Sequence, residues 1–316
     1  IFGITGVYVS SAFIRLELFA SLSLIIFASI GVSILSKEIF KINFSGLKNY
    51  VFKTSFIIIV LILFITPLVY PDSSSGNWIS VVDIPPTILT GGTNQPPTDD
   101  WLDTLEWIKN NTPQDAVIAS WWDYGYWITT LSDRTTLIDN ATLIDSRIKD
   151  VAKIFLSSPD QGWNLLREWN ADYVVVFITL DRLENYSNSG ERLYVLGKGG
   201  DETKSQWFIR IAGLPIQEYL YSDLYTVNNN FLNNTLLGKM IPYSPIAYYD
   251  QRNDQSWTEF RPGFIPLYVE DIKYNSEDGP LKFVYSSPSF NNEKNGSIGV
   301  VLVYKINENY IPLNLQ

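Results

Sequence analysis

Two long apolar segments near the N-terminus constrain the fold of this chain more than any other feature. They extend over about residues 7–35 and 50–69, and charged residues are rare in both. Because a helix needs about 20 consecutive apolar residues to cross a bilayer, each segment is long enough for one crossing. We therefore predict two transmembrane helices within residues 1–70. The alternative is a buried helical hairpin in a soluble protein.

The charges beside these segments predict their orientation. Four lysines lie near the connection, at residues 37–53, whereas the chain after the second segment continues Tyr-Pro-Asp. Loops rich in Lys and Arg stay on the cytoplasmic side of a membrane. We therefore expect the connection in the cytoplasm and the remainder of the chain on the extracellular side.

Composition excludes several classes of function. The formal net charge is −10, and residues 71–316 hold 18 basic and 31 acidic residues, which argues against a nucleic-acid partner. The chain has no His and no Cys, so it cannot contain a Ser-His-Asp triad, a thiol nucleophile, a histidine zinc site or a disulfide. Any metal that it holds needs oxygen ligands, which favours Mg, Mn or Ca.

Beyond the apolar segments, the pattern predicts a mixed α/β domain with a β-rich C-terminal part. Residues 71–97 are rich in Pro, Ser and Gly and read as a linker. We expect an α/β domain at 98–245 and the β-rich part at 246–316, because short apolar strands alternate with helical segments. The expected helices lie near 98–111, 144–156, 163–169 and 218–240, and the expected strands lie near 116–120, 135–138, 173–177, 264–269, 281–285 and 298–304.

The segment Trp121-Trp122-Asp123-Tyr124-Gly125 is the strongest candidate for a site. It follows a short apolar strand and precedes a helical segment, so it forms a corner whose side chains can face a cleft. An indole N–H only donates hydrogen bonds and an ionised Asp only accepts them, so together they can hold a hydroxyl. The alternative is that both Trp rings are core residues and that Asp123 caps the next helix.

This segment resembles the signature of the catalytic subunit of oligosaccharyltransferase. That membrane enzyme transfers a glycan from a polyprenyl (dolichyl) phosphate or diphosphate carrier to Asn in Asn-x-Ser/Thr. The resemblance continues through residues 110–113, Trp127 and residues 133–140, and it covers nearly the whole chain. It implies that Trp121, Trp122 and Asp123 bind the acceptor Ser/Thr hydroxyl, with motif support from Tyr124 and Gly125.

A second resemblance concerns residues 201–211. The second family motif has an Asp and a Lys three residues apart on a helix that also carries a hydrophobic pair facing the acceptor peptide. It implies acceptor contacts from Lys204 and Ile211, supported by Asp201 and Phe208, where Met is commoner. On a helix these four positions share one face. The alternative is an ordinary amphipathic surface helix.

The segment around Arg15 resembles a late membrane helix of the same family. A charged side chain within a membrane helix marks a functional site by default, or else it reaches the interface from near the end of the span. The resemblance implies that Arg15 contacts the lipid-linked phosphate, a role that suits a permanently charged guanidinium.

The resemblance also implies what this chain lacks. In the family, the catalytic acids and the divalent metal, Mn or Mg, belong to loops between earlier membrane helices. We therefore expect no catalytic residue and no metal ligand here, and we expect the chain, which does not begin with Met, to be a C-terminal portion that is inactive alone. The absence of Cys and the predicted orientation favour an archaeal source.

The implied partners are a lipid-linked oligosaccharide, an acceptor polypeptide with Asn-x-Ser/Thr, and membrane lipid, without nucleic acid. The alternative function is a non-catalytic, membrane-anchored surface module that binds peptide or glycan. A structural surface-layer anchor is a third possibility. Three weaker patterns are interpreted as structural: the acidic pairs Asp99-Asp100 and Asp250/Asp254, and the glycine-rich turn at 197–200.

Overall fold

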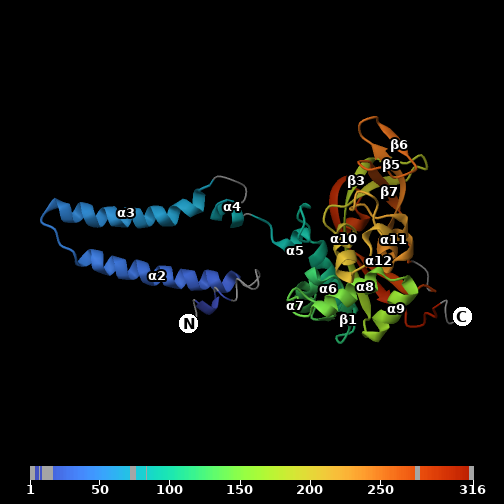
Figure 1. Ribbon diagram of the computed structural model, residues 1–316, viewed down its shortest axis with the longest axis horizontal. Helices are drawn as coiled ribbons and strands as arrows, with labels where there is room; N and C mark the ends of the chain where they lie inside the picture. The colour runs from blue at the N-terminus through green and yellow to red at the C-terminus, as the bar shows by residue number, and fades with distance from the viewer. Residues whose placement is uncertain are drawn as a thin grey trace. The chain divides into compact units, whose positions relative to one another are not determined.

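The computed structural model describes residues 4–6, 8, 17–71, 76–82, 84–274 and 278–312 (Figure 1). Within it the chain divides into two compact units, Ile1–Ile84 and Pro85–Gln316. The first unit contains the apolar helices and the second is the mixed α/β domain, in the order that the sequence predicted.

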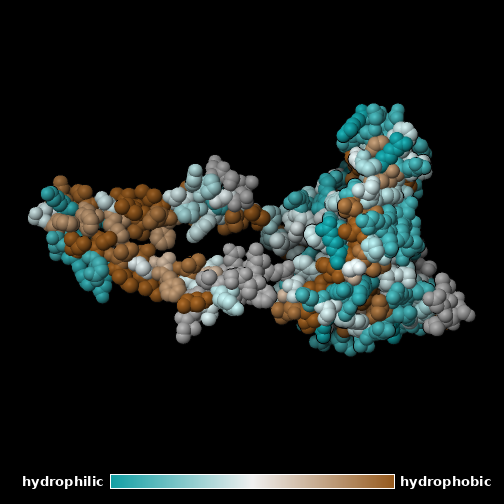
Figure 2. All heavy atoms as spheres, in the orientation of Figure 1, coloured by the Kyte–Doolittle hydropathy of each residue, from teal (hydrophilic) through white to brown (hydrophobic). Residues whose placement is uncertain are grey.

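The first unit contains two long helices, α2 (Glu17–Lys41) and α3 (Leu47–Val69), followed by the short α4 (Trp78–Val82). The segments Phe19–Lys41 and Leu47–Val69 are long and apolar enough to cross a membrane. No residue of α3 is buried, and Figure 2 shows apolar side chains covering both helices. A core hairpin of a soluble protein would bury these side chains, so the exposure favours the predicted membrane spans.

The connection between the two helices is shorter than expected. We predicted a loop near 37–53, but α2 continues to Lys41 and α3 begins at Leu47. The charged residues Lys37 and Glu38 are therefore helical, because Lys and Glu are good helix formers once they leave the apolar region. Lys41 Nζ lies 2.6 Å from Glu38 Oε1 in the last turn of α2.

The described part of the second unit contains one mixed sheet of nine strands in the order β2-β1-β3-β4-β7-β5-β6, with β9 pairing β3 and β8. Strand β1 is parallel to β2 and β3, and all other pairs are antiparallel. The strands are β1 (Val117–Ala119), β2 (Thr135–Thr136), β3 (Tyr173–Tyr186), β4 (Arg192–Leu196), β5 (Tyr243–Asp250), β6 (Gln255–Trp257), β7 (Ile265–Glu270), β8 (Leu281–Ser286) and β9 (Gly296–Ile306).

Helices cover this sheet and provide the rest of the core. The helical segments are α5 (Thr87–Thr90), α6 (Asp100–Asn111), η2 (Trp122–Tyr124), α7 (Gly125–Leu131), α8 (Asp145–Leu156), α9 (Pro159–Glu168), α10 (Asp201–Ala212), η3 (Ile216–Glu218), α11 (Asn229–Asn234), α12 (Leu236–Met240) and η4 (Pro288–Asn291). Helix α8 packs against α10, α9 and α12. Helix α6, expected near 98–111, buries Trp101, Leu105 and Ile108 on one face.

The longest strand, β3, holds the unit together. Its first eight residues are buried, and it pairs with β9 over ten consecutive register positions, including Val175 opposite Val303. Strands from residues 98–245 and from 246–316 therefore share hydrogen bonds in one sheet. The three C-terminal strands lie where the sequence predicted them.

The prediction of a helix over residues 218–240 was wrong. The chain instead forms η3, a bridge between Leu220 and Val227, and two short helices. The Asn228 side chain accepts a hydrogen bond from Phe231 N, and the Thr235 side chain accepts one from Gly238 N. These residues each start a new helix, because Asn and Thr at the N-cap satisfy backbone donors that a continuous helix would occupy itself.

Candidate functional site

The predicted corner after β1 is present. Trp121 is extended, residues 122–124 form η2, and α7 begins at Gly125. A Cβ atom on Gly125 would lie 2.5 Å from Asp139 Cα and 2.6 Å from Ile138 O. Both distances are too short for real atoms, so only glycine lets the corner pack against residues 138–139.

Asn140 ties the corner to the segment after β2. Its Nδ2 atom donates to the backbone oxygen of Asp123 over 2.8 Å, and its Oδ1 atom accepts from Tyr126 N over 3.1 Å. The amide thus satisfies one backbone group on either side of Gly125. These two hydrogen bonds give Asn140 a structural role beside the segment 121–125.

Arg134 is a buried cation that stabilises helix ends. Its Nη2 donates to Lys109 O (2.7 Å) and Thr112 O (2.8 Å), its Nε donates to Thr112 Oγ1 (2.9 Å), and its Nη1 donates to Ser132 O (3.1 Å). These carbonyls lie at the C-terminal ends of α6 and α7, where positive charge is favourable. Arg134 therefore joins the segments 110–113 and 133–140.

Helix α10 brings the second motif to the corner through Lys204. The Lys204 Nζ atom lies 2.8 Å from Asp123 Oδ2 and donates to Tyr124 Oη over 2.9 Å. The same ammonium sits 4.7 Å from the centre of the Tyr124 ring. One cation thus fixes two residues of the signature.

The buried carboxylate of Asp201, at the start of α10, holds the Tyr124 hydroxyl from the interior of the domain. Tyr124 Oη donates to Asp201 Oδ1 over 2.8 Å, and Phe177 N donates to Asp201 Oδ2 over 2.9 Å. Burial raises the pKa of Asp201 to about 6, although Lys204 opposes the shift. Burial and the nearby Asp201 raise the pKa of Tyr124 well above its usual range, so Tyr124 stays a neutral donor.

Glu202 is a structural residue that sequence reasoning missed. Its carboxylate accepts from Thr179 Oγ1 (2.6 Å), Thr179 N (3.2 Å) and Gly200 N (3.2 Å). Burial raises the pKa of Glu202 to about 7. The only sequence signal was an acid in the first turn of a helix, which is usually solvated. Here it anchors the start of α10 to β3, and the turn at 197–200 is held by these contacts.

Two aromatic residues of the predicted site lie in the core. The rings of Trp121 and Phe208 are stacked with 3.8 Å between their centres, and Trp121 is 2% exposed and Phe208 fully buried. Phe155 of α8 packs edge-on against Phe208, with 5.5 Å between ring centres. The sequence placed Trp121 and Phe208 near an acceptor peptide. In the structure the two rings stack on each other beside the corner.

Four predicted residues remain partly exposed. The side chains of Asp123 and Lys204 are 28% and 18% exposed, and Trp122 and Ile211 are half-buried. Lys204 and Ile211 are seven residues apart on α10 and therefore share a helix face. Arg15 lies outside the described residues.

The described residues do not fit a divalent metal. They contain no group of three or more Asp, Glu, His or Cys side chains that could hold an ion. Asp123 faces the cation of Lys204, Asp100 accepts from Ser289 N and Oγ, and Asp250 accepts from Arg252 N and the Asn253 amide. Each of these three carboxylates therefore already has a partner within the protein.

Comparison with known families concerns the same region. The STT3/PglB/AglB core domain matches residues 113–178, which include the corner, Asn140 and the start of β3. The subunit STT3 of dolichyl-diphosphooligosaccharide–protein glycosyltransferase from Saccharomyces cerevisiae is 31% identical over 153 residues, covering 45% of this chain and 19% of the relative. The Dictyostelium discoideum subunit STT3 is 27% identical over 262 residues, covering 79% of this chain and 34% of the relative. The chain thus spans about a fifth to a third of these relatives.

Among solved structures, the C-terminal globular domain of oligosaccharyltransferase from Archaeoglobus fulgidus aligns with 67% of this chain and 99% of that domain. The TM-score is 0.37 and the sequence identity is 18%. Values this low do not establish a common fold.

Proposed function

We propose that this chain is the acceptor-recognition part of an oligosaccharyltransferase, which transfers a glycan from a polyprenyl phosphate or diphosphate carrier to Asn in Asn-x-Ser/Thr. The observation that carries the proposal is the contact between Lys204 Nζ and Asp123 Oδ2, 2.8 Å long, because it unites two motifs that lie 81 residues apart in one site. The family match over residues 113–178 and the names of the curated relatives support it.

Asp123 is the proposed acceptor of the Ser/Thr hydroxyl. Lys204 occupies Oδ2, and Oδ1 has no hydrogen bond or ion pair within the described part of the chain. A carboxylate held on one oxygen and partly exposed on the other can accept a hydroxyl proton without reorganising. An acceptor without that hydroxyl would cover the carboxylate of Asp123 and leave it without this partner, at a cost of about 1–3 kcal/mol.

The neighbouring residues complete the proposed pocket. Trp122 lies beside Asp123 and would donate its indole N–H to the hydroxyl oxygen. Ile211 would pack against the methyl group of an acceptor Thr. Trp121 and Phe208 stack on each other in the core beside this surface, and the hydrogen bond from Trp121 to the hydroxyl stays a prediction from the sequence.

The remaining parts of the proposal concern the membrane. Helices α2 and α3 would anchor the chain with the lysine-rich connection in the cytoplasm and the α/β domain on the extracellular side. The contact of Arg15 with the lipid-linked phosphate and the archaeal source stay predictions from the sequence. The described residues contain no group that could hold the expected Mn or Mg. In this proposal the chain's own contribution is therefore to bind and orient the acceptor peptide.

Peptide binding tests the proposal. The detergent-solubilised chain should bind an Asn-x-Thr peptide about tenfold more tightly than the matching Asn-x-Val peptide, measured by fluorescence anisotropy. Asp123→Ala removes both oxygens of the carboxylate and should abolish this preference. Asp103→Ala, at an exposed acid of α6, should preserve it. Equal binding of both peptides to the wild type would contradict the proposal and favour a surface module without sequon selectivity.

A further inference from the structure

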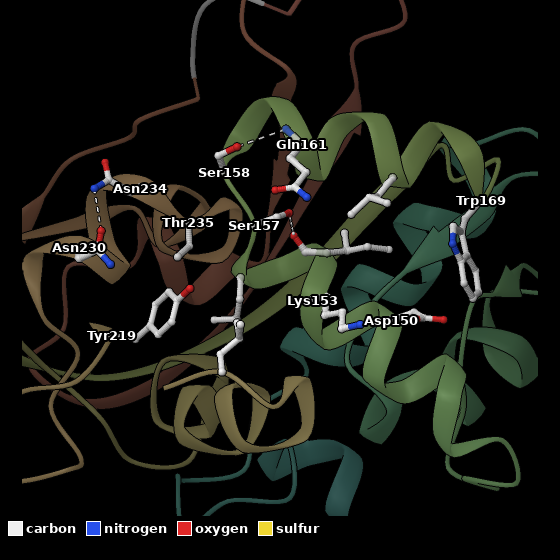
Figure 3. A pocket seen from close by; sticks show the side chains of 14 residues that line it. Asp150, Lys153, Ser157, Ser158, Gln161, Trp169, Tyr219, Asn230, Asn234 and Thr235 are labelled. Carbon is white, nitrogen blue, oxygen red and sulfur yellow. Dashed lines mark hydrogen bonds between the residues drawn. The ribbon is translucent and has the colours of Figure 1, made fainter. Parts of the chain in front are cut away.

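A concave surface lies apart from the Asp123 site, between α8, α9 and α11 (Figure 3). This groove has a volume of about 570 Å³, within the range of about 300–1,000 Å³ that is usual for small-ligand sites. Helix α8 separates the two sites: Phe155 packs toward Phe208, whereas Lys153 and Ile154 line the groove. We call it the α8–α9–α11 groove, and the residues that matter are Lys153, Gln161, Trp169, Tyr219, Asn230 and Asn234.

Three neutral amide groups, of Gln161, Asn230 and Asn234, belong to the polar lining of the groove. Asn234 Nδ2 donates to Asn230 Oδ1 over 2.8 Å, and Asn230 Nδ2 donates to Glu218 O over 2.9 Å. These bonds fix both amides and leave Asn234 Oδ1 available to a ligand. The side-chain amide of Gln161 makes no hydrogen bond within the described part of the chain. Because an amide donates and accepts at once, paired amides match the neighbouring hydroxyl groups of a sugar.

Aromatic rings supply the complementary apolar surface. Trp169 and Tyr219 line the groove, pack against the core and remain partly exposed. Figure 3 shows them on opposite sides of the groove. The C–H faces of a sugar ring pack against such rings, which present an apolar body and a polar tip. The combination of rings and amides is therefore suited to a saccharide.

The sequence of α11 is unusual for a helix at this position. Four of its six residues are Asn, a poor helix former because its side chain competes for backbone hydrogen bonds. The helix persists because Phe231 and Leu232 are buried and Asn228 caps it. Residues that disfavour the structure in which they lie are expected at functional sites. The asparagines of α11 fit this expectation, because Asn230 and Asn234 line the groove.

The charges of the groove exclude a strongly ionic ligand. Lys153 and Asp150 are its charged lining residues, and their charges cancel. A phosphate or a nucleic acid would need a clear excess of positive charge. A neutral ligand rich in hydroxyl groups needs none.

We propose that the α8–α9–α11 groove binds a neutral oligosaccharide. A sugar ring packs on Trp169 or Tyr219, and Asn234 and Gln161 bond to its hydroxyl groups. This binding uses none of the residues assigned above to peptide recognition. In an enzyme that handles glycans, the groove would hold part of a glycan on the donor or on the glycosylated product.

Saturation-transfer NMR on the full chain tests this inference. The protein is made in a host without asparagine-linked glycosylation, because Asn233-Asn234-Thr235 is itself an Asn-x-Thr sequence and its last two residues line the groove. It is held in a detergent without a sugar headgroup. The probes are diacetylchitobiose, cellobiose and mannobiose. At least one should receive saturation, and Asn234→Leu or Gln161→Leu should weaken its binding about tenfold.

Two comparisons make the result specific. Asn164→Leu is the matched control, because Asn164 is exposed on α9 and does not line the groove. It should bind the disaccharide like the wild type, and thermal unfolding should show that every variant is folded. Asn-x-Thr peptide binding should be unchanged by Asn234→Leu, so the two proposals fail separately. Absence of saturation transfer to all three disaccharides, or equal transfer in wild type and Asn234→Leu, overturns the inference.

Discussion

Tyr124 and Asp201, 77 residues apart in the sequence, share a buried hydrogen bond of 2.8 Å. The same hydroxyl accepts from Lys204 over 2.9 Å. A single phenol therefore links the corner after β1 to the start of α10 and holds the ammonium that contacts Asp123. The geometry of the candidate site depends on this chain of contacts, because neither motif alone positions Lys204.

Tyr124→Phe removes this link. Asp201 Oδ1 and Lys204 each lose a partner in the interior, so the free energy of unfolding should fall by about 1–3 kcal/mol. Urea unfolding followed by circular dichroism would measure the change. Tyr126→Phe is the control, since Tyr126 is 48% exposed and should change stability little. Equal stability of the two variants would mean that the buried hydroxyl contributes nothing.

The two buried acids of α10 make the stability of the α/β domain depend on pH. Burial raises the pKa of Asp201 to about 6 and the pKa of Glu202 to about 7, from ordinary values near 4. Between about pH 4 and 7 the folded protein therefore binds more protons than the unfolded chain, and its stability falls as the pH rises.

Glu202→Gln tests this dependence. The variant should lose less stability than the wild type between pH 4.5 and 7 by at most about 3 kcal/mol, since one pKa unit corresponds to about 1.4 kcal/mol. Thermal melts at a series of pH values would show it. Glu168→Gln, at an exposed residue of α9, should follow the wild-type curve. A Glu202→Gln curve parallel to that of the wild type would refute the assignment.

Gly125→Ala should destabilise the corner. The added methyl group would overlap the backbone of residues 138–139. This segment can move only by breaking the two hydrogen bonds of the Asn140 side chain. We expect a loss of about 1–3 kcal/mol together with weaker peptide binding. Gly31→Ala in α2 is the control, because an added methyl group there meets nothing within 4 Å. Retained stability and binding in Gly125→Ala would show that the corner tolerates a side chain.

Arg134→Lys tests the buried guanidinium. A lysine keeps the charge but cannot reach the carbonyls of Lys109, Thr112 and Ser132 together, because its donors do not form a planar fork. Unpaired carbonyls at the ends of α6 and α7 should lower stability by about 1–3 kcal/mol. The exposed Arg147→Lys should be neutral in the same melts.

The elements with a local signal were predictable. The apolar helices, the buried face of α6, the corner around Gly125 and the C-terminal strands follow from segment length, from residue periodicity and from the chemistry of helix and turn residues. The prediction failed at residues 218–240, where the N-caps Asn228 and Thr235 divide an apparently continuous helix.

The sequence by itself determined the elements with a strong local pattern, such as the apolar helices and the strands β3, β7, β8 and β9. It also determined which side-chain chemistries are absent, since the chain has no His and no Cys, but it did not predict β4, β5 or β6. Only the tertiary structure decided that β3 pairs with β9, that Lys204 meets Asp123, that Trp121 and Phe208 stack in the core, and that α8, α9 and α11 enclose a groove. The physical reason is that periodicity reports only which face of an element is buried. The partner of that face depends on contacts between distant segments, which no local pattern specifies.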